Sequence, residues 1–522
     1  MLEMVEETPN WKEKVITGDE TWVYGYDPET KRQSMEWKGK DEPRTKKSRL
    51  CKSKNKVLLV TFFDIKGIMH YEYLEEGQTI NKESYLNIMR RVRESIRLKR
   101  SEIEMAWSTR KRRQKYQPPA KRCRKIQEEE DKSTEHNRTF YFWLPPDREY
   151  SMGLDHPMAP FRMTLTDDLV MLYDLFSHMK VFEALPTTFD KLATYHTPEY
   201  INHLQTVPVG YKGTEFGFGH DCPSFIDLQD FVMSSANAAI QGANLLRTGY
   251  ADTIINWHGG YHHAMPDRAS GFCYVNDVVL SIQELLKTYQ RVLYIDIDHH
   301  HGDGVEHAFK SSNRVFTLSL HKYDGVFFPR TGSLAECGEG SGRGYSLNLP
   351  LKDNINDENY CYIYKAAVSR VAEFFCPEAI VLQSGADSLA HDYLGSFNLT
   401  EKGYVNCQKT VKNLGLPYIL TGGGGYTIYN VARCWAYQTA EAVGEADSVP
   451  RNIPLHNYYH YYAPSFMSEI MAKDVKDQNN RLYLDSLIQT THERMAGTGS
   501  GSQCWTWPIH VVPPSILVDS LE

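Results

Sequence analysis

Short apolar runs alternate with amphipathic stretches along most of the second half of this chain. The runs DTIINW, RVLYIDID, RVFTLSL, EAIVLQ and LPYILT have the length and composition of strands that are buried on both faces. Stretches with helical periodicity, such as 276–289 and 359–375, lie among them. From about residue 139 onward this alternation predicts an α/β fold, in which a parallel sheet is sandwiched by helices.

The pattern before residue 100 is different and predicts a small separate α/β fragment. Strands are expected at 20–28, 31–38 and 56–74, followed by a basic amphipathic helix over 80–100. We therefore divide the chain into an N-terminal fragment, a linker, a main domain and a C-terminal tail: 1–100, 101–138, 139–455 and 456–522.

Positive charge is concentrated in the linker. Nine basic residues and no acidic residue lie between Arg110 and Lys125, and an acidic run follows at 128–131. Two basic clusters across a short spacer are typical of a bipartite nuclear import signal, and also of a phosphate-binding patch. A solvated linker that binds no receptor is the alternative. We expect the protein in the nucleus, with the cytoplasm as a second location.

The net charge, the cysteine count and the length of the apolar runs exclude several classes of protein. A formal net charge of −8 over 522 residues excludes a polycation that coats nucleic acid along its whole length. Ten cysteines without a CxxC pair predict reduced thiols. No run of eighteen or more apolar residues occurs, so we expect no membrane-spanning helix.

The segment VLYIDIDHHHGDG (292–304) is the strongest candidate for a functional site. Asp296, Asp298 and His300 alternate at the end of an apolar strand, so their side chains point to the same side. Open α/β sheets bind ligands at that end of the strand. Buried carboxylates and imidazoles are costly without a cation, and this set suits zinc or iron with open coordination positions. The alternative is a polar turn with a salt-bridged Asp.

Four other polar clusters follow predicted strands or lie in glycine-containing loops. They are a histidine pair in NWHGGYHHA, the acid of LQSGAD, the tyrosine after four glycines and the acid of FGHDCP: His262, His263, Asp387, Tyr426 and Asp221. Each alone has an ordinary explanation, such as a core histidine pair, a tight glycine turn or a turn-forming Asp. Their common place at strand ends predicts one site, with Asp387 as a third metal ligand.

Further motifs join these clusters in one pattern: HPMAPFR, HDCP, ASGFCYVNDVVL, LHKYDGVFFPRTG, LQSGADSL and GGGGYTIYNVARCW. Over about 139–444 the chain resembles class I histone deacetylases, most of all the subtype found in nuclear-receptor corepressor complexes. The resemblance implies the arginase–deacetylase fold and a zinc-dependent protein-lysine deacetylase that acts on histone tails and represses transcription. A polyamine deacetylase of the same fold is the alternative enzyme, and the HDCP and tunnel motifs argue against it.

Carried over residue by residue, the resemblance assigns zinc ligation to Asp298, His300 and Asp387. It assigns proton transfer, the support of that transfer and oxyanion binding to five residues: His262, His263, Asp296, Asp303 and Tyr426. It assigns substrate contacts in the acetyl-lysine tunnel and at its rim to five others: Asp221, Gly271, Phe272, Phe328 and Leu394. A structural potassium ion is implied at an overlapping set: Asp296, Asp298, His300, Ser319 and Leu320. In this family zinc polarises the acetyl carbonyl, and the histidine pair moves the protons.

Several positions depart from the family pattern without removing a reacting group. Near the site these are His258, Tyr261, His299 and Arg330. A second group lies where the corepressor-bound subtype has basic residues that bind an inositol phosphate: Ala159, Tyr393 and Tyr429, with Arg433 retained. Without those cations a multiply charged phosphate has little to bind. We therefore expect activity with an altered substrate choice, and a corepressor partnership that depends less on inositol phosphate.

The N-terminal fragment has a resemblance of its own. TGDETWVYGYDPETKRQS, VTFFDIKGI and EGQTINKESYLNIMRRVRESIRLKR resemble a mariner-type transposase catalytic domain, which implies a partial RNase H-like α/β fold. That family holds two metal ions with three acidic residues; Asp19 matches the first, and the other two have no counterpart. One carboxylate does not build a two-metal site. We expect an inactive fragment that does not bind DNA, with a non-catalytic DNA-tethering scaffold as the alternative function.

Overall fold

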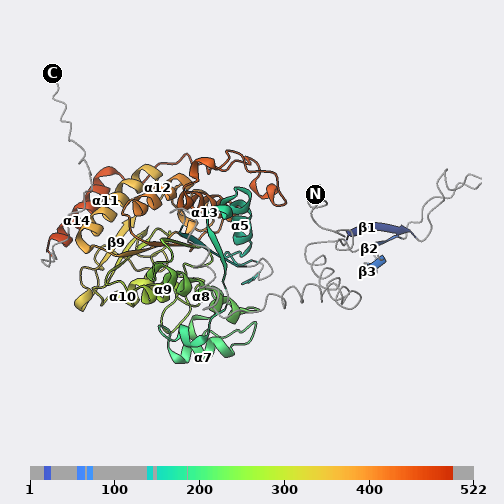
Figure 1. The fold of residues 1–522 in the computed structure, drawn as a ribbon, viewed down its shortest axis with the longest axis horizontal. Coiled ribbons are helices and arrows are strands. Elements are labelled where there is room, and N and C mark those ends of the chain that lie inside the picture. Colours follow the sequence, from blue (N-terminus) through green and yellow to red (C-terminus); the bar gives the residue numbers. More distant parts are fainter. Residues whose placement is uncertain are drawn as a thin grey trace, which may run out of the picture. The chain divides into compact units, whose positions relative to one another are not determined.

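The structure divides into two compact units. A computed structural model describes residues 17–24, 56–64, 67–73, 138–144, 150–153, 155–184 and 186–497. Unit 1 is Met1–Thr134 and unit 2 is Glu135–Glu522 (Figure 1). Each unit contains its own β-sheet.

Unit 1 contains a three-stranded antiparallel sheet in the order β1-β2-β3. Its strands are β1 (Thr17–Tyr24), β2 (Lys56–Asp64) and β3 (Gly67–Tyr73). Asp19 lies in β1, opposite Thr61 of β2. Two of the predicted strands overlap these elements. The predicted strand at 31–38, the helix over 80–100 and the linker up to residue 137 lie outside the described residues.

Unit 2 is built on an eight-stranded parallel sheet in the order β5-β4-β6-β11-β10-β7-β8-β9. The strands are β4 (Thr139–Trp143), β5 (Lys180–Glu183), β6 (Thr253–Asn256), β7 (Val292–Asp296), β8 (Val315–Lys322), β9 (Ser346–Leu351), β10 (Ala379–Gln383) and β11 (Tyr418–Thr421). The five predicted strands correspond to β6, β7, β8, β10 and β11.

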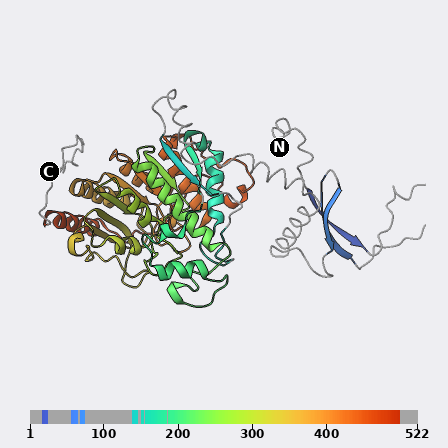
Figure 2. The same cartoon turned by 60° about the horizontal axis from the view of Figure 1, so that its bottom comes forward.

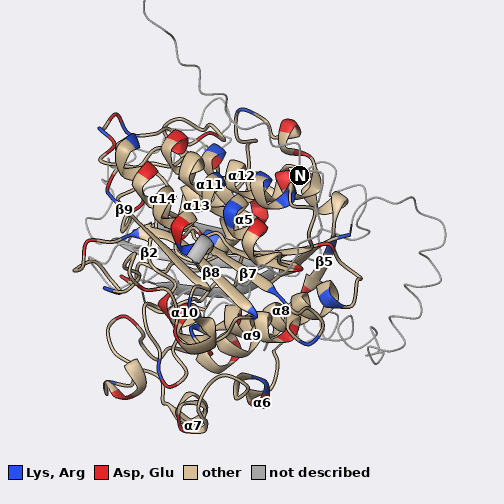
Figure 3. Cartoon of the chain, turned by 90° about the vertical axis from the view of Figure 1, so that its left-hand side faces the viewer, with Lys and Arg blue, Asp and Glu red and all other residues tan. Residues whose placement is uncertain are grey.

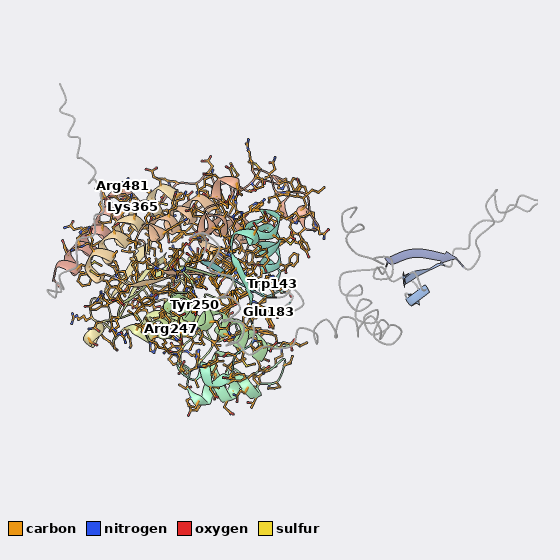
Figure 4. The ribbon with its side chains drawn as sticks, in the orientation of Figure 1. Trp143, Glu183, Arg247, Tyr250, Lys365 and Arg481 are labelled. Atoms are coloured by element: carbon orange, nitrogen blue, oxygen red, sulfur yellow. The ribbon has the colours of Figure 1, made fainter. Side chains whose placement is uncertain are left out.

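The strands that the sequence pattern did not single out lie at the two edges of this sheet. At one edge Trp143 of β4 pairs with Glu183 of β5 (Figure 4). At the other edge β9 contains Pro350, which has no N–H and is tolerated on an edge strand. Strand β5 is mostly exposed and lacks an apolar run, whereas β4 and β9 are buried along almost their whole length.

Helices cover both faces of the sheet, which confirms the predicted α/β architecture. Figures 1 and 3 show α5, α11, α12, α13 and α14 on one face and α8, α9 and α10 on the other. The helices are α5 (Phe161–Leu172), α6 (Phe189–Leu192), α7 (Pro198–Thr206), α8 (Leu228–Arg247), α9 (Asp277–Leu285), α10 (Asp303–Phe309), α11 (Asp357–Phe375), α12 (Glu401–Lys412), α13 (Ile428–Val443) and α14 (Arg481–Gly497). None of the helices in the described ranges combines the length and hydropathy needed to span a bilayer.

Side-chain caps fix where the two predicted helices begin. Asn276 accepts a hydrogen bond from the N–H of Val279 (3.0 Å) at the start of α9. Asn356 accepts one from the N–H of Asn359 (3.0 Å) at the start of α11. Such caps satisfy N–H groups that the first helical turn leaves without a partner. Both helices therefore start close to the predicted positions, whereas α9 ends at Leu285, before the predicted end at 289.

The strand order creates a crevice at one end of the sheet. After β7 the chain continues outward through β8 and β9, then returns to the other side of β7 to form β10 and β11. Parallel sheets bind ligands outside the carboxyl ends of their strands at such a reversal. Strands β7 and β8 carry Asp, Glu, Lys or Arg only at their last residues, Asp296 and Lys322. The charged groups of these strands therefore lie at the crevice.

The folded unit continues beyond the predicted boundary at residue 455. Tyr462, Ile470 and Leu484 are buried in the same apolar core as the central strands. Helix α14 lies beside α11 in both views of the ribbon (Figures 1 and 2). The segment 456–497 is therefore part of the main domain, because its apolar side chains complete the core that α11 borders.

Most of the described cysteines are free thiols: Cys222, Cys273, Cys337, Cys361, Cys407 and Cys434. Burial raises the pKa of several of them, including that of Cys434. Cys376 is instead disulfide-bonded, so the prediction of reduced thiols is wrong at this position.

Candidate active site

The three predicted metal ligands come together at the crevice. Asp298 and His300 follow β7, Asp387 follows β10, and these two strands pair in the sheet. His300 Nδ1 lies 3.2 Å from Asp298 Oδ1 and 2.9 Å from Asp387 Oδ2. One ligand atom of each residue lies within 4.8 Å of the others, and all three residues are buried. Three ligands at this spacing suit one ion with open coordination positions.

The electrostatics of this cluster favour a cation. Burial and the neighbouring Asp298 raise the pKa of Asp387 to about 7. Two buried carboxylates side by side repel each other, and a divalent ion between them removes that cost. Two carboxylates and one imidazole form a donor set that zinc binds in proteins. The residues present therefore fit a zinc ion.

Neutral donors hold the two carboxylates in place. Asp298 Oδ2 accepts hydrogen bonds from Gln383 Nε2 (2.9 Å) and from the N–H of Gly424 (2.9 Å). Asp387 Oδ1 accepts one from the N–H of His299 (2.8 Å). Neutral donors orient a carboxylate without cancelling its charge, so both groups remain available as metal ligands.

The histidine pair lies beside the cluster, and a carboxylate supports each ring. Nδ1 of His262 lies 2.8 Å from Asp296 Oδ2, and Nδ1 of His263 lies 2.7 Å from Asp303 Oδ1. The two ring centroids are 4.0 Å apart, and His262 Nε2 lies 3.7 Å from Asp298 Oδ2. A carboxylate that accepts from Nδ1–H fixes the tautomer and leaves Nε2 for proton exchange.

The two imidazoles differ in proton affinity. Burial opposes the charged form of both rings, but at His262 the carboxylates of Asp296 and Asp298 outweigh burial and raise the pKa to about 9. At His263 burial and the charge of His262 lower the pKa to about 4. Adjacent groups with separated pKa values supply one ring that holds a proton and one that accepts it.

Glycines let the loop after β11 pass directly against the metal cluster. A Cβ atom at Gly424 would lie 2.2 Å from Asp387 Oδ2, so only glycine allows this approach. Arg162 fixes the loop, because its guanidinium donates to the carbonyls of Gly423 and Gly425, both at 2.8 Å. The loop is thus held in contact with the ligands, although its glycines alone do not restrain it.

Aromatic residues surround the approach to the histidine pair. The ring of Tyr426, at the end of the glycine loop, lies 5.8 Å from that of Phe272, and Phe328 lies 4.9 Å from His263. Gly271 has a left-handed backbone (φ +52°), and a Cβ there would lie 2.5 Å from the His263 ring. Burial raises the pKa of Tyr426, and the nearby carboxylates raise it further. The Tyr426 hydroxyl therefore stays protonated and can donate a hydrogen bond.

The other predicted substrate contacts lie at more exposed positions. The Asp221 side chain is 69% exposed, and its carbonyl accepts a hydrogen bond from His156 Nε2 (3.2 Å). His156 packs edge-on against Phe272, with 4.6 Å between ring centroids. Leu394 is half-buried, and its N–H donates to Asp392 Oδ1 (2.9 Å). These residues are accessible to a ligand that arrives from solvent.

The residues implied for potassium lie on two paired strands. Asp296 at the end of β7 is opposite Ser319 of β8, and Leu320 follows in the same strand. Ser319 Oγ is hydrogen-bonded with His321 Nδ1 (2.8 Å), which fixes the side chain. Backbone oxygens at adjacent strand ends are ligands of the kind that hard cations prefer. A potassium ion at this place stays a prediction.

Two departures from the family pattern line a cavity next to the site. The cavity has a volume of about 510 Å³ and is lined mainly by apolar side chains, with polar ones that include Arg162, Asp167, Asp168, His258 and Tyr261. His258 Nε2 lies 3.8 Å from Asp167 Oδ2. The third departure, His299, is buried, and its Nε2 accepts a hydrogen bond from the backbone of the loop after β10. The extra histidines therefore have polar neighbours within the fold.

Arg433, the basic residue retained from the predicted inositol phosphate site, is used inside the fold. Its guanidinium donates to the carbonyl of Met467 (2.8 Å), to Asn430 Oδ1 (3.0 Å) and to the carbonyl of Tyr462 (3.3 Å). Tyr393, one of the replaced positions, is 75% exposed. Arg433 thereby joins α13 to the segment that follows residue 455.

Sequence reasoning missed three residues that support the site: Arg162, Gln383 and Asp392. Each forms hydrogen bonds to groups that are distant along the chain, as described above for Arg162 and Gln383. Asp392 accepts hydrogen bonds from the backbone of the loop after β11. A single polar residue carries little signal of its own, but Arg162 lies in the HPMAPFR motif, Gln383 lies in LQSGADSL, and Asp392 closely follows the second motif.

The fold and the site together define a hydrolase with a candidate metal centre at the reversal of a parallel sheet. The histone deacetylase domain model matches residues 156–442. Histone deacetylase 1 of Homo sapiens is 44% identical over 352 residues, which cover 66% of this chain and 72% of that protein. The chain therefore belongs to the histone deacetylase family, and its main domain has the arginase–deacetylase fold of that family.

The N-terminal part has its own match. The model described as transposase (partial DDE domain) matches residues 27–105. This match confirms that a partial transposase domain precedes the deacetylase domain.

Proposed function

We propose that this protein is a zinc-dependent protein-lysine deacetylase that removes acetyl groups from histone tails and represses transcription. One observation carries the proposal: the buried cluster of Asp298, His300 and Asp387 lies at the same strand ends as an imidazole pair. A site that hydrolyses an amide needs a Lewis acid and a proton carrier within reach of one reacting carbon. Membership of the histone deacetylase family supports the same reaction.

Asp298, His300 and Asp387 would hold the zinc ion. When bound, zinc supplies a Lewis acid for the acetyl carbonyl and lowers the pKa of an attacking water. The chain itself orients the two carboxylates: Gln383 and the N–H of Gly424 hold Asp298, and the N–H of His299 holds Asp387. Three protein ligands would leave coordination positions of the ion for water and substrate.

Proton transfer would use Nε2 of the histidine pair. The carboxylates of Asp296 and Asp303 hold the Nδ1 side of the rings, so only Nε2 of each ring exchanges protons. A neutral imidazole accepts the proton of the attacking water and later donates one to the leaving lysine amine. The separated pKa values of His262 and His263 support a pair in which one ring is already charged and the other is neutral.

Tyr426 would donate its hydroxyl hydrogen to the oxyanion that forms from the acetyl carbonyl. Its raised pKa keeps that hydrogen in place at neutral pH. Phe272 and Phe328 would hold the aliphatic stem of the acetyl-lysine, with Gly271 leaving room for it. Leu394 and Asp221 at the exposed end would contact the peptide on either side of the modified lysine.

The proposed setting is the nucleus, where acetylated histone tails are the substrates. The basic clusters between Arg110 and Lys125 support nuclear import. A corepressor complex is the proposed partner, with a weakened contribution from inositol phosphate, since Ala159, Tyr393 and Tyr429 carry no charge. A potassium ion near Ser319 and Leu320 would stabilise the loop that holds Asp298.

The test is the release of acetate from an acetyl-lysine peptide by the purified full chain. Tyr426→Phe should lower kcat by roughly 100- to 1000-fold with little change in KM, as expected for loss of one oxyanion donor. Tyr250→Phe is the matched control, because Tyr250 follows α8 at the surface (41% exposed; Figure 4), and it should leave kcat unchanged.

Acetylated polyamines are the second substrate in the same assay. Turnover of the polyamine with none of the peptide would replace this proposal with that of a polyamine deacetylase. No turnover of either substrate, together with salt-sensitive DNA binding, would favour the scaffold instead.

A further inference from the structure

The loop between β10 and α12 contains a buried carboxylate to which no role has been assigned. Asp392 is 8% exposed and accepts four backbone hydrogen bonds. Its Oδ1 accepts from the N–H groups of Leu394 (2.9 Å) and Gly395 (3.1 Å). Its Oδ2 accepts from those of Tyr426 (2.7 Å) and Thr427 (3.2 Å). Each oxygen therefore serves a different loop.

Asp392 bridges the two loops that carry Asp387 and Tyr426. Oδ1 closes a turn in its own loop, and Oδ2 reaches the end of the glycine loop that follows β11. Hydrogen bonds to an ionised acceptor are shorter and roughly twice as strong as neutral ones. A second contact joins the same loops, since Thr427 Oγ1 donates to the carbonyl of His391 (2.8 Å). Tyr426 is thus anchored by its backbone to the loop that carries a metal ligand.

The turn that Asp392 closes packs tightly against the loop that carries the metal ligand Asp387. A Cβ atom at Gly395 would lie 1.9 Å from the carbonyl oxygen of Asp387. The turn that Asp392 closes therefore packs directly against the backbone of the ligand itself. Any displacement of Asp392 is transmitted to Tyr426 through the two hydrogen bonds of Oδ2.

The preceding residues give Tyr426 little support of their own. Four glycines, which have the widest backbone freedom of all residues, lead into it. Arg162 holds the carbonyls of Gly423 and Gly425, ahead of the tyrosine, and Asp392 holds the N–H groups of Tyr426 and the residue after it. The position of the phenol therefore depends on both anchors.

We propose that Asp392 is a positioning residue, which sets the distance between the Tyr426 hydroxyl and the ligand Asp387 through its bridge between the two loops. The proposal rests on the function proposed above for Tyr426. Displacement of a reacting group by about 1 Å costs roughly 100-fold in rate. An anchor of this kind acts on the transition state and has little effect on substrate affinity.

The test is Asp392→Asn in the full chain. Asn keeps the shape but offers one acceptor oxygen, so its amide group faces either the Tyr426 and Thr427 donors or those of Leu394 and Gly395. We expect kcat for an acetyl-lysine peptide to fall by about 10- to 100-fold, with KM changed by less than about threefold. The backbone amides of Tyr426 and Thr427 should also exchange hydrogen faster than in the wild type.

Asp357→Asn is the matched control. Asp357 likewise accepts from a backbone N–H and a hydroxyl, both of Thr400, with distances of 2.8 and 2.5 Å, but it joins α11 to α12 away from the site. It should lower Tm at least as much as Asp392→Asn does and leave kcat unchanged. A control variant that lost as much kcat as Asp392→Asn would overturn the proposal, since loss of stability alone would then explain both.

A double-mutant cycle with Tyr426→Phe separates positioning from a general structural effect. If Asp392 acts through the phenol, Asp392→Asn adds less than about twofold to the loss of kcat in the Tyr426→Phe background. The proposal would be wrong if the loss of kcat in the double variant equalled the product of the two single losses. It would also be wrong if Asp392→Asn alone kept the kcat of the wild type. A wild type that does not turn over the peptide rejects the proposed function instead, and amide exchange then still decides whether the bridge exists.

Discussion

The two units of this chain match two different families, and within the residues that the structure describes the ligands of a metal site come together in unit 2. In unit 2, ligands from two paired strands meet, and two neighbouring loops add the imidazoles and Tyr426. In unit 1, Asp19 lies within β1 opposite Thr61, and the sequence contains no counterpart for the other two acids. A metal site arises where ligands from several strand ends converge, and one carboxylate does not build a two-metal site.

The largest effect is expected from removal of metal, which should abolish the activity assigned to unit 2. Dialysis of the full chain against a chelator is expected to lower acetate release by roughly 1000-fold or more, because the Lewis acid contributes several kcal/mol. Added zinc should restore the rate. Asp387→Ala should be inactive with or without zinc. Full activity of the chelated protein would show that the cluster holds no catalytic metal.

A second effect, expected to be about 100-fold, tests the tunnel wall of unit 2. In Gly271→Ala the new methyl group meets the rings of His263 (2.5 Å) and Phe328 (2.9 Å), so kcat/KM should fall by roughly that factor. Gly415→Ala is the control, because Gly415 has a similar backbone (φ +67°) but nothing within 4 Å of its Cβ position. The Gly415→Ala variant should be less stable than the wild type but should keep the same kcat/KM. Equal activity losses in both variants would show that backbone strain, and not obstruction of the tunnel, causes the loss.

A buried acid away from the site gives unit 2 a pH-dependent stability. Burial raises the pKa of Glu401 from 4.5 to about 7, although the N–H of Ile470 donates to it (2.8 Å). Between those values the folded state keeps a proton that the unfolded state releases, so stability falls as pH rises through this window. Above about pH 7 the ionised group destabilises the fold by up to about 3 kcal/mol.

Glu401→Gln keeps an acceptor for Ile470 without the charge. Denaturant unfolding from about pH 5 to pH 8 should show that the variant gains stability over the wild type as pH rises. The two proteins should be most alike at the acid end. A variant that is less stable than the wild type at about pH 8 would contradict this account.

The smallest effect is expected from loss of unit 1. A chain that starts at residue 135 should keep kcat/KM for the acetyl-lysine peptide within about twofold, because all the named site residues lie in unit 2. The full chain should not cleave DNA with Mg²⁺ or Mn²⁺, and Asp19→Ala should change nothing. If the full chain cleaved DNA and Asp19→Ala abolished the cleavage, other residues of the chain would have to complete a metal site with Asp19.

Local patterns predicted much of the fold. The central strands were visible because each is an apolar run buried on both faces, and α9 and α11 were visible from their helical periodicity. Their N-caps, Asn276 and Asn356, were recognised only in the structure. The edge strand β9 was missed, and so was the contribution of 456–497 to the core. In that segment single apolar residues such as Leu484 pack against distant helices, and such contacts leave no local period.

What the sequence determined by itself was the chemistry available at each strand end, that is, which side chains follow β6, β7, β10 and β11. Only the tertiary structure decided that β10 lies against β7, which brings Asp387 to Asp298 and His300. The supports of the site, Arg162 and Asp392, likewise emerged only there. Strand order and long-range hydrogen bonds depend on contacts between residues far apart in the chain, whereas side-chain direction along a strand depends on the backbone alone.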